Sequence, residues 1–214
     1  FSYIQTALRH GGLDYILKTD GEETIVQAVQ NAIASLSRDS EIDRHLERAN
    51  NQMQQMLPAL QRDYADQLVH GQIPVRQEHL DELHIALDSA APFLLMIARV
   101  DRWREHETAS NKALLHYAIQ NIAEEYWTGC RCFHSTVERT LLIAFLQPQA
   151  ADNWRDHPER WVKFVHGQLD SIQSACREYL RLPVSFASSG NLVQWRDVPV
   201  KFAELKQILF HGFG

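Results

Sequence analysis

The sequence contains little that would form disulfides, span a membrane or attract nucleic acid. Only three of its 214 residues are cysteines, and this sparse, odd number favours a reducing compartment over a disulfide framework. Its longest apolar runs are about ten residues, too short for a membrane-spanning helix. Basic residues form no cluster and the net charge is −6, so direct binding of nucleic acid is disfavoured. We therefore expect a cytoplasmic protein that binds no membrane.

The composition is that of an ordinary globular protein. Hydrophobic residues make up 45% of the chain and charged residues 22%. A chain of 214 residues is long enough for one or two domains with a sizeable core.

Histidine is plentiful, but few histidines and cysteines stand at spacings typical of a metal site. Cys130, Cys132 and His134 alternate along an expected strand, so their side chains should share one face. No fourth ligand accompanies them, and ordinary strand roles are favoured over a zinc site. The eleven histidines include no pair four residues apart with a glutamate between them, so solvated or capping roles are favoured. We expect no metal and no cofactor.

Residues 7–18 read Ala-Leu-Arg-His-Gly-Gly-Leu-Asp-Tyr-Ile-Leu-Lys. This stretch resembles the last strand of a phosphoacceptor receiver domain and the end of the helix before it. In that family the lysine at the strand end contacts the phosphorylated carboxylate, and an aromatic residue three positions earlier reorients on activation. The resemblance implies that Tyr15 and Lys18 are the receiver switch-like residues. Thr19 stands where the family usually has proline.

The acceptor aspartate and the metal-binding acids of a receiver domain would lie before this strand. The chain begins at Phe1 rather than at a methionine. We therefore expect an internal piece of a longer signalling protein, in which residues 1–36 are the carboxyl-terminal remnant of a receiver domain.

A long amphipathic helix should follow, and we assign residues 37–84 to a helical connector or stalk. Apolar residues recur at heptad spacing along one face of this helix. This pattern already begins before residue 37, with heptads counted from Ile25. Its a positions are Ile25, Ala32, Asp39, Leu46, Met53 and Leu60, and its d positions are Ala28, Ser35, Ile42, Ala49 and Met56. This spacing favours a coiled-coil-like stalk that pairs two copies of the chain. The alternative is an amphipathic helix that lies on its own domain.

Two residues should interrupt or end this helix. Pro58 lacks a backbone donor and crowds the preceding turn, so we expect a kink or a helix restart there. Gly71 should end the helix.

Residues 85–214 predict an α+β domain. Strands are expected at 92–100, 130–135, 139–146 and 183–188, and helices at 111–127, 161–180 and 198–210. The order strand, helix, strand, strand, helix, strand, helix corresponds to a ferredoxin-like βαββαβ arrangement with an added helix.

Residues 93–210 resemble the degenerate diguanylate-cyclase-like module of bacterial transcription regulators. The resemblance is carried by the order of elements and by the patches Arg99–Trp103, Thr140–Gln147 and Pro183–Ala187. Active cyclases place a metal-binding acid where this chain has Arg99, which would repel a divalent ion. They also need a glycine-rich hairpin, and the segment 133–139 has no glycine and a single carboxylate, Glu138. The resemblance therefore implies that the module is not an enzyme.

Taken together, the segments resemble the middle of an AraC-type two-component response regulator of the YesN kind. The resemblance implies a non-catalytic signal-relay segment for transcription control, which pairs as a homodimer through its stalk. A sensor histidine kinase and DNA would be contacted only through parts outside this chain. The alternative is a domain that senses a small molecule or nucleotide, suggested by the cyclase resemblance and by five tryptophans, which lie within residues 85–214.

Overall fold

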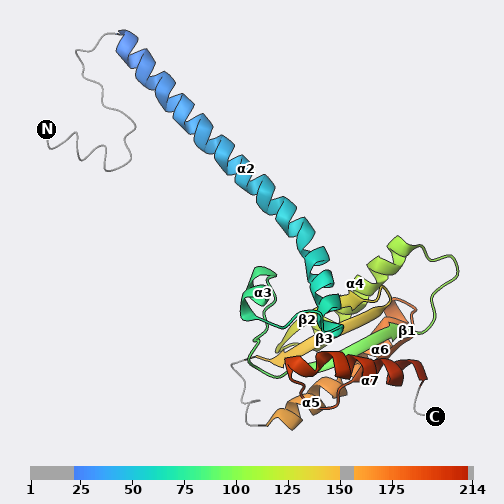
Figure 1. Cartoon of the computed structure of the whole chain (residues 1–214). Helices are drawn as coiled ribbons and strands as arrows, with labels where there is room; N and C mark the ends of the chain where they lie inside the picture. The colour runs from blue at the N-terminus through green and yellow to red at the C-terminus, as the bar shows by residue number, and fades with distance from the viewer. Residues whose placement is uncertain (1–21, 150–156, 212–214) are drawn as a thin grey trace. The chain divides into compact units, whose positions relative to one another are not determined.

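A computed structural model describes residues 22–149 and 157–211, with several residues between 22 and 50 described by their backbone alone. The chain is a mixture of helix and sheet and is 56% helical. It divides into two compact units, Phe1–Met56 and Leu57–Gly214, and each is considered by itself. The elements, drawn in Figure 1, are α2 (Glu22–Val69), α3 (Gln77–Glu82), β1 (Leu94–Val100), α4 (Ala109–Tyr126), β2 (Cys130–Val137), β3 (Leu141–Pro148), α5 (Pro158–Gly167), α6 (Leu169–Tyr179), β4 (Val184–Ser188), the 3₁₀ helix η2 (Trp195–Asp197) and α7 (Val198–His211).

The first unit contributes helix α2 up to Met56, and its described apolar side chains are open to solvent. The large hydrophobic residues are between 44% and 60% exposed: Ile25, Val26, Val29, Ile33, Met53 and Met56. Exposed apolar side chains on a helix contribute little to its stability in water, because most helical stability in proteins comes from packing of the apolar face. The described apolar side chains of this part of α2 therefore gain little stability from packing within the first unit.

Helix α2 continues through Pro58, so of the predicted kink or helix restart, the restart does not occur. A proline interrupts one backbone hydrogen bond, but its fixed φ is compatible with helical geometry. The helix ends as predicted at Gly71, which has a φ of 66°. The amide of Gly71 donates to the carbonyl of Leu68 at 3.1 Å, and that of Gln72 to the carbonyl of Gln67 at 3.0 Å. These two bonds satisfy carbonyls that the helix end would otherwise leave unpaired.

The second unit is built on a four-stranded sheet in the order β2-β3-β1-β4. Every neighbouring pair is antiparallel. Ile97 of β1 lies opposite both Ile143 of β3 and Ala187 of β4, so β1 is bonded on both edges. All four predicted strands are present, and the prediction of a mixed helix-and-sheet domain is confirmed.

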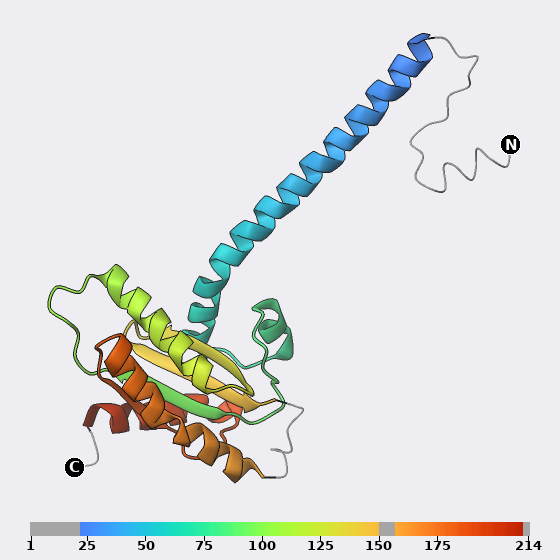
Figure 2. The same ribbon diagram turned by 180° about the vertical axis from the view of Figure 1, so that it is seen from behind.

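Helices cover both faces of this sheet. Helices α4, α5 and α6 lie over one face, and α7 lies over the other together with residues 64–69 of α2 (Figures 1 and 2). Successive residues of a strand point to opposite faces. Leu95 and Ile97 accordingly join the core under α7, whereas Met96 and Ala98 join the core under α4. Burial on both sides explains why β1 and β3 are almost continuously apolar.

An aromatic group fills the core under α7. The ring centroids of Phe93 and Trp195 are 4.3 Å apart, and those of Phe145 and Trp195 are 5.6 Å apart with nearly parallel planes. Phe133 also stacks on Phe145, with ring centroids 5.7 Å apart. Offset and tilted aromatic pairs at these separations add to the stability gained from burial alone. They connect β1, β2 and β3 with the segment that leads into α7.

The second long helix of the domain is two helices, which corrects the prediction of one helix over 161–180. Helix α5 ends at Gly167 and α6 begins at Leu169, with Gln168 between them. The amide of Gln168 donates to the carbonyl of Val165 at 3.2 Å, which is a tighter, three-residue step. Glycine is a poor helix former, so the break falls beside Gly167.

We predict that Gly71→Ala destabilises the second unit by about 1–2 kcal/mol, because a left-handed residue with a Cβ is strained. The added Cβ would also lie 3.1 Å from Cγ of Pro199. Gly190→Ala is the matched control, since Gly190 has a φ of 74° and no atom lies within 4 Å of the place its added Cβ would occupy. Urea unfolding should show a larger loss for Gly71→Ala. Equal losses would mean that the close approach to Pro199 has no energetic weight.

Candidate functional site

The carboxyl end of β1 is where the resemblance to cyclases places a metal site. Asp101 follows β1, and its Oδ1 accepts a hydrogen bond from Nη2 of Arg99 at 3.1 Å. Its Oδ2 accepts from the hydroxyl of Ser185 at 2.8 Å. The Arg99 guanidinium also lies 4.7 Å from the ring centroid of Phe210. Both oxygens of Asp101 are therefore engaged, and a divalent ion would have to compete with a cation already in place.

The turn between β2 and β3 is short and left-handed. Glu138 has a φ of 49° and Arg139 a φ of 63°, and neither is glycine. The amide of Thr140 donates to the carbonyl of Val137 at 3.3 Å and closes the turn. Left-handed backbone favours glycine because a Cβ crowds the following carbonyl. The turn therefore holds two strained residues, which its surroundings must stabilise.

The Glu138 cluster consists of Glu138, Asp66, His70 and Lys206. Nζ of Lys206 lies 2.7 Å from Oε1 and 2.8 Å from Oε2 of Glu138, so the ammonium bridges both oxygens. Nε2 of His70 lies 3.5 Å from Oε1 of Glu138. The backbone amide of Glu138 donates to Oδ1 of Asp66 at 3.0 Å. One turn residue thus bonds to α2 and to α7.

A groove of about 870 Å³ runs beside this cluster. It is lined by Val69, His70, Glu138, Phe202, Lys206 and Phe210, among others. Its charged groups are already paired with one another, and the Phe210 ring is 48% exposed. The groove therefore offers an apolar surface with a charged rim rather than a free charge.

A second cavity, of about 420 Å³, lies at the opposite end of β2 from the turn. It is lined by residues of the segment before β1, of β2 and β3, and of α5, including Asp88, Arg131, Gln147, Pro158 and Trp161. The amide of Gln147 is completely buried and donates to the carbonyls of Asp88 and Ala91, at 2.8 and 3.0 Å. Its Oε1 accepts from the Asp88 amide at 2.8 Å, so this side chain is satisfied.

Arg131 lies opposite Gln147 in the β2–β3 pair, but its side chain is not fully hydrogen-bonded within the described residues. Nε of Arg131 is buried and, within the described residues, has no hydrogen-bond partner. Buried polar groups nearly always have a partner, and a missing one has a free-energy cost. Arg131 lines a cavity whose walls include Trp161 and Pro92, so this is the described site best suited to an anionic ligand with an apolar body.

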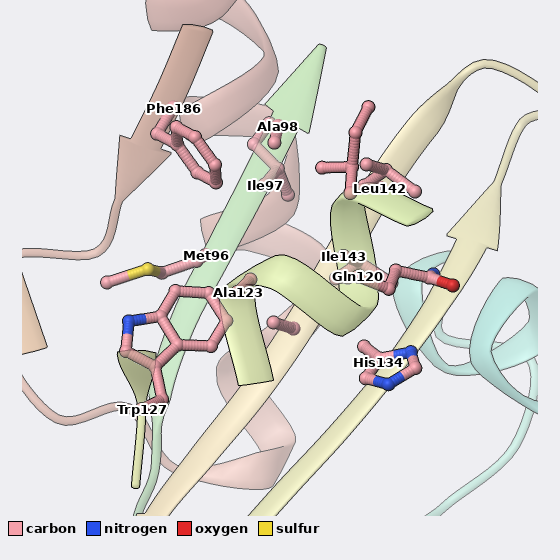
Figure 3. A pocket seen from close by; sticks show the side chains of 12 residues that line it. Met96, Ile97, Ala98, Gln120, Ala123, Trp127, His134, Leu142, Ile143 and Phe186 are labelled. Atoms are coloured by element: carbon pink, nitrogen blue, oxygen red, sulfur yellow. The ribbon is translucent and has the colours of Figure 1, made fainter. Parts of the chain in front are cut away.

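A third cavity lies between α4 and the sheet (Figure 3). It is lined by Met96, Ala98, Gln120, Ala123, Trp127, His134, Leu142 and Phe186, among others. Its volume is about 20 Å³, which is room for one water molecule. At its edge, Nε2 of His134 lies 2.7 Å from Oε1 of Glu124, which fixes the imidazole. The cavity is a packing gap and not a ligand site.

The prediction that Cys130, Cys132 and His134 share one face of a strand is confirmed. The two thiols pack against the core under α4, and His134 lines the cavity on the same side. Burial, with Glu124 and Cys130 nearby, raises the pKa of the Cys132 thiol, so this thiol is protonated and a poor ligand or nucleophile. In residues 22–149 and 157–211, no three side chains of the metal-binding types form a group that could hold an ion.

One serine and one histidine do meet, although the sequence showed no nucleophile motif. Nε2 of His166 lies 2.7 Å from Oγ of Ser188. Burial lowers the pKa of His166, which favours the neutral ring. Catalytic pairs of this type have a third group that orients the base and a cavity for the substrate. In the described part of the chain, no acidic side chain hydrogen-bonds to His166, and neither residue lines the cavities above. We interpret the pair as a link between α5 and β4.

The switch-like residues Tyr15 and Lys18 lie outside the described residues, as does the rest of the sequence up to residue 21. No sequence signal marks the Glu138 cluster or Arg131 as functional, because Glu138 stands out only as the single carboxylate of the hairpin. The partners of Glu138 lie 68 and 72 positions away, and no short spacing could have indicated them.

Comparison with known proteins identifies no relative. No protein-family model matches the chain, and neither a curated protein nor a solved structure matches it. Within the described residues, no helix combines the length and apolar character needed to cross a membrane.

We predict that Arg139→Gly raises the free energy of unfolding by up to about 1 kcal/mol, because glycine adopts the left-handed conformation without steric cost. Arg139 is exposed and forms no ion pair in the described structure, so little else should change. Arg139→Ala keeps the strain and should leave stability nearly unaltered. Thermal unfolding of both variants measures this, and an equal gain for alanine would mean that removal of the arginine side chain, and not the backbone, is responsible.

Proposed function

We propose that this chain is a non-catalytic signal-relay segment of a YesN-like, AraC-type two-component response regulator that controls transcription from the cytoplasm. The observation that carries the proposal is the pairing of Arg99 with Asp101 at the carboxyl end of β1. Arg99 occupies the position of a cyclase metal ligand, and it neutralises Asp101 at 3.1 Å. The antiparallel order β2-β3-β1-β4 is the order of a ferredoxin-like sheet, which supports a cyclase-like origin.

The β2–β3 turn also supports a relay rather than catalysis. Its carboxylate, Glu138, is bridged by Lys206 and is therefore not free to hold a metal. Its backbone is held by Asp66 of α2 rather than left open for the phosphates of a nucleotide. The turn thus serves contacts within the protein.

A homodimer through the stalk is the second part of the proposal. Two observations support it: the heptad spacing from Ile25, and the exposure of the described apolar side chains on that helix, such as Met53 at 53% and Met56 at 60%. Pairing two such helices would bury these residues against each other. A histidine kinase and DNA would act through other parts of the full protein.

Light scattering at high protein concentration tests the dimer. We expect the wild-type chain to be dimeric, and Met53→Lys with Met56→Lys to shift it to monomer, because two charges would enter the seam at a and d. Gln54→Lys with Gln55→Lys adds the same charge beside the seam and should leave the dimer intact. A monomeric wild-type chain would refute the stalk proposal.

The alternative function, sensing of a small molecule or nucleotide, is favoured by one observation. The cavity of about 420 Å³ holds Arg131, whose buried Nε lacks a partner within the described residues. A carboxylate or phosphate group would satisfy the guanidinium, and an apolar body would contact Trp161 and the neighbouring prolines.

A thermal-shift series with phenylacetate, citrate, inorganic phosphate and GTP tests this alternative. A ligand at one hundred times its dissociation constant should stabilise the protein by about 2.7 kcal/mol. Arg131→Met should abolish that gain, and Arg102→Met, a change at an exposed arginine, should not. Stabilisation by none of the four compounds, or stabilisation that survives Arg131→Met, would remove support for a ligand site at Arg131.

A further inference from the structure

Glu138 is the one residue of the β2–β3 turn that bonds to two helices distant in sequence. Its amide donates to Asp66 of α2 at 3.0 Å, and its carboxylate accepts from Lys206 of α7 at 2.7 and 2.8 Å. His70, one helical turn after Asp66, approaches the same carboxylate at 3.5 Å. All four residues belong to the second unit.

The turn itself is too constrained to follow either helix independently. Its two left-handed residues are closed by the bond from Thr140 to Val137, and the strands pair up to the Val137–Leu141 position. A displacement of Asp66 therefore pulls on a backbone group that can move only with the hairpin. The carboxylate of Glu138, attached to the same residue, then changes its position relative to Lys206.

Direct contacts place the end of α2 beside the start of α7 as well. The rings of His70 and Phe202 have centroids 6.3 Å apart, and a Cβ at Gly71 would come within 3.1 Å of Pro199. Neither approach involves a hydrogen bond, whereas the bonds of Glu138 have defined donors and acceptors. The polar route is therefore the one that is sensitive to small displacements.

We propose that Glu138 is a coupling joint: it transmits displacement or loosening at the carboxyl end of α2 to α7, and the reverse. The biological meaning of this coupling rests on the proposed relay function, in which α2 would receive the signal and α7 would lead toward the output. The physical coupling does not depend on that function, because it is a property of the second unit alone.

Hydrogen exchange of the whole chain, resolved by peptide, tests the joint. Asp66→Ala removes the acceptor on α2 and touches no residue of α7 through a bond. We expect it to speed exchange in residues 200–211 about two- to fivefold, the range expected from the free energy of partly exposed polar contacts. Lys206→Met should speed exchange in residues 64–70 to a similar degree, because thermodynamic coupling is reciprocal.

Glu204→Gln provides the matched control. It breaks an ion pair on α7, with Lys201 at 2.6 Å, that does not reach the turn. Exchange in residues 64–70 should stay at the wild-type rate in this variant. Glu138→Gln keeps the amide bond to Asp66 and weakens the bond to Lys206. Its effect on hydrogen-exchange rates should therefore resemble that of Lys206→Met and not that of Asp66→Ala.

The proposal is overturned if Asp66→Ala alters exchange only within α2, or if Glu204→Gln affects α2 as much as Lys206→Met does. The changes are at surface or half-buried positions, so the variants should fold, which circular dichroism verifies. A monomeric chain that shows reciprocal coupling would refute the stalk dimer and leave the joint standing. A dimeric chain without reciprocal coupling would support the stalk dimer and refute the joint.

Discussion

Burial of both faces of β1 and β3 is the constraint on which the second unit depends. These two central strands alternate their side chains between two cores, so helices must cover both sides of the sheet. Helix α4 and the α5–α6 pair supply one cover, and α7 with residues 64–69 of α2 supplies the other. The carboxyl part of α2 is therefore part of the domain core, through residues such as Leu68, and not merely an attachment to it.

Hydrogen-bonded polar side chains join distant segments of the chain at both ends of this sheet. At one end Gln147, fully buried, ties the segment before β1 to β3 through three hydrogen bonds. At the other end Glu138 ties the hairpin to α2 and α7. Buried or half-buried polar groups of this kind define register and orientation, because a shifted arrangement would leave them unpaired. The two ends thus differ in role: one anchors the entry of the chain into the sheet, and the other joins helices.

Apolar periodicity was sufficient to predict the strands, α4 and α7, because each buries a regular stripe or a continuous run. The α5–α6 break was missed, since the stripe continues across it and only Gly167 marks the point. The Glu138 cluster and the Arg131 cavity could not be predicted. Both arise where segments far apart in the chain meet, and a single glutamate or arginine carries no periodic signal. Whether Tyr15 and Lys18 act as in a receiver domain stays a prediction.

The described tryptophans are divided between the two cores. Trp195 packs in the aromatic group under α7, whereas Trp127 and Trp161 are buried under α4 and α5. Each layer of helices therefore contains its own intrinsic fluorophore in a distinct environment. Emission from Trp195 would follow rearrangement of the α7 layer, while Trp127, Trp161 and the partly buried Trp103 would report on the opposite layer, so optical spectroscopy could distinguish which side of the second unit responds to a stimulus.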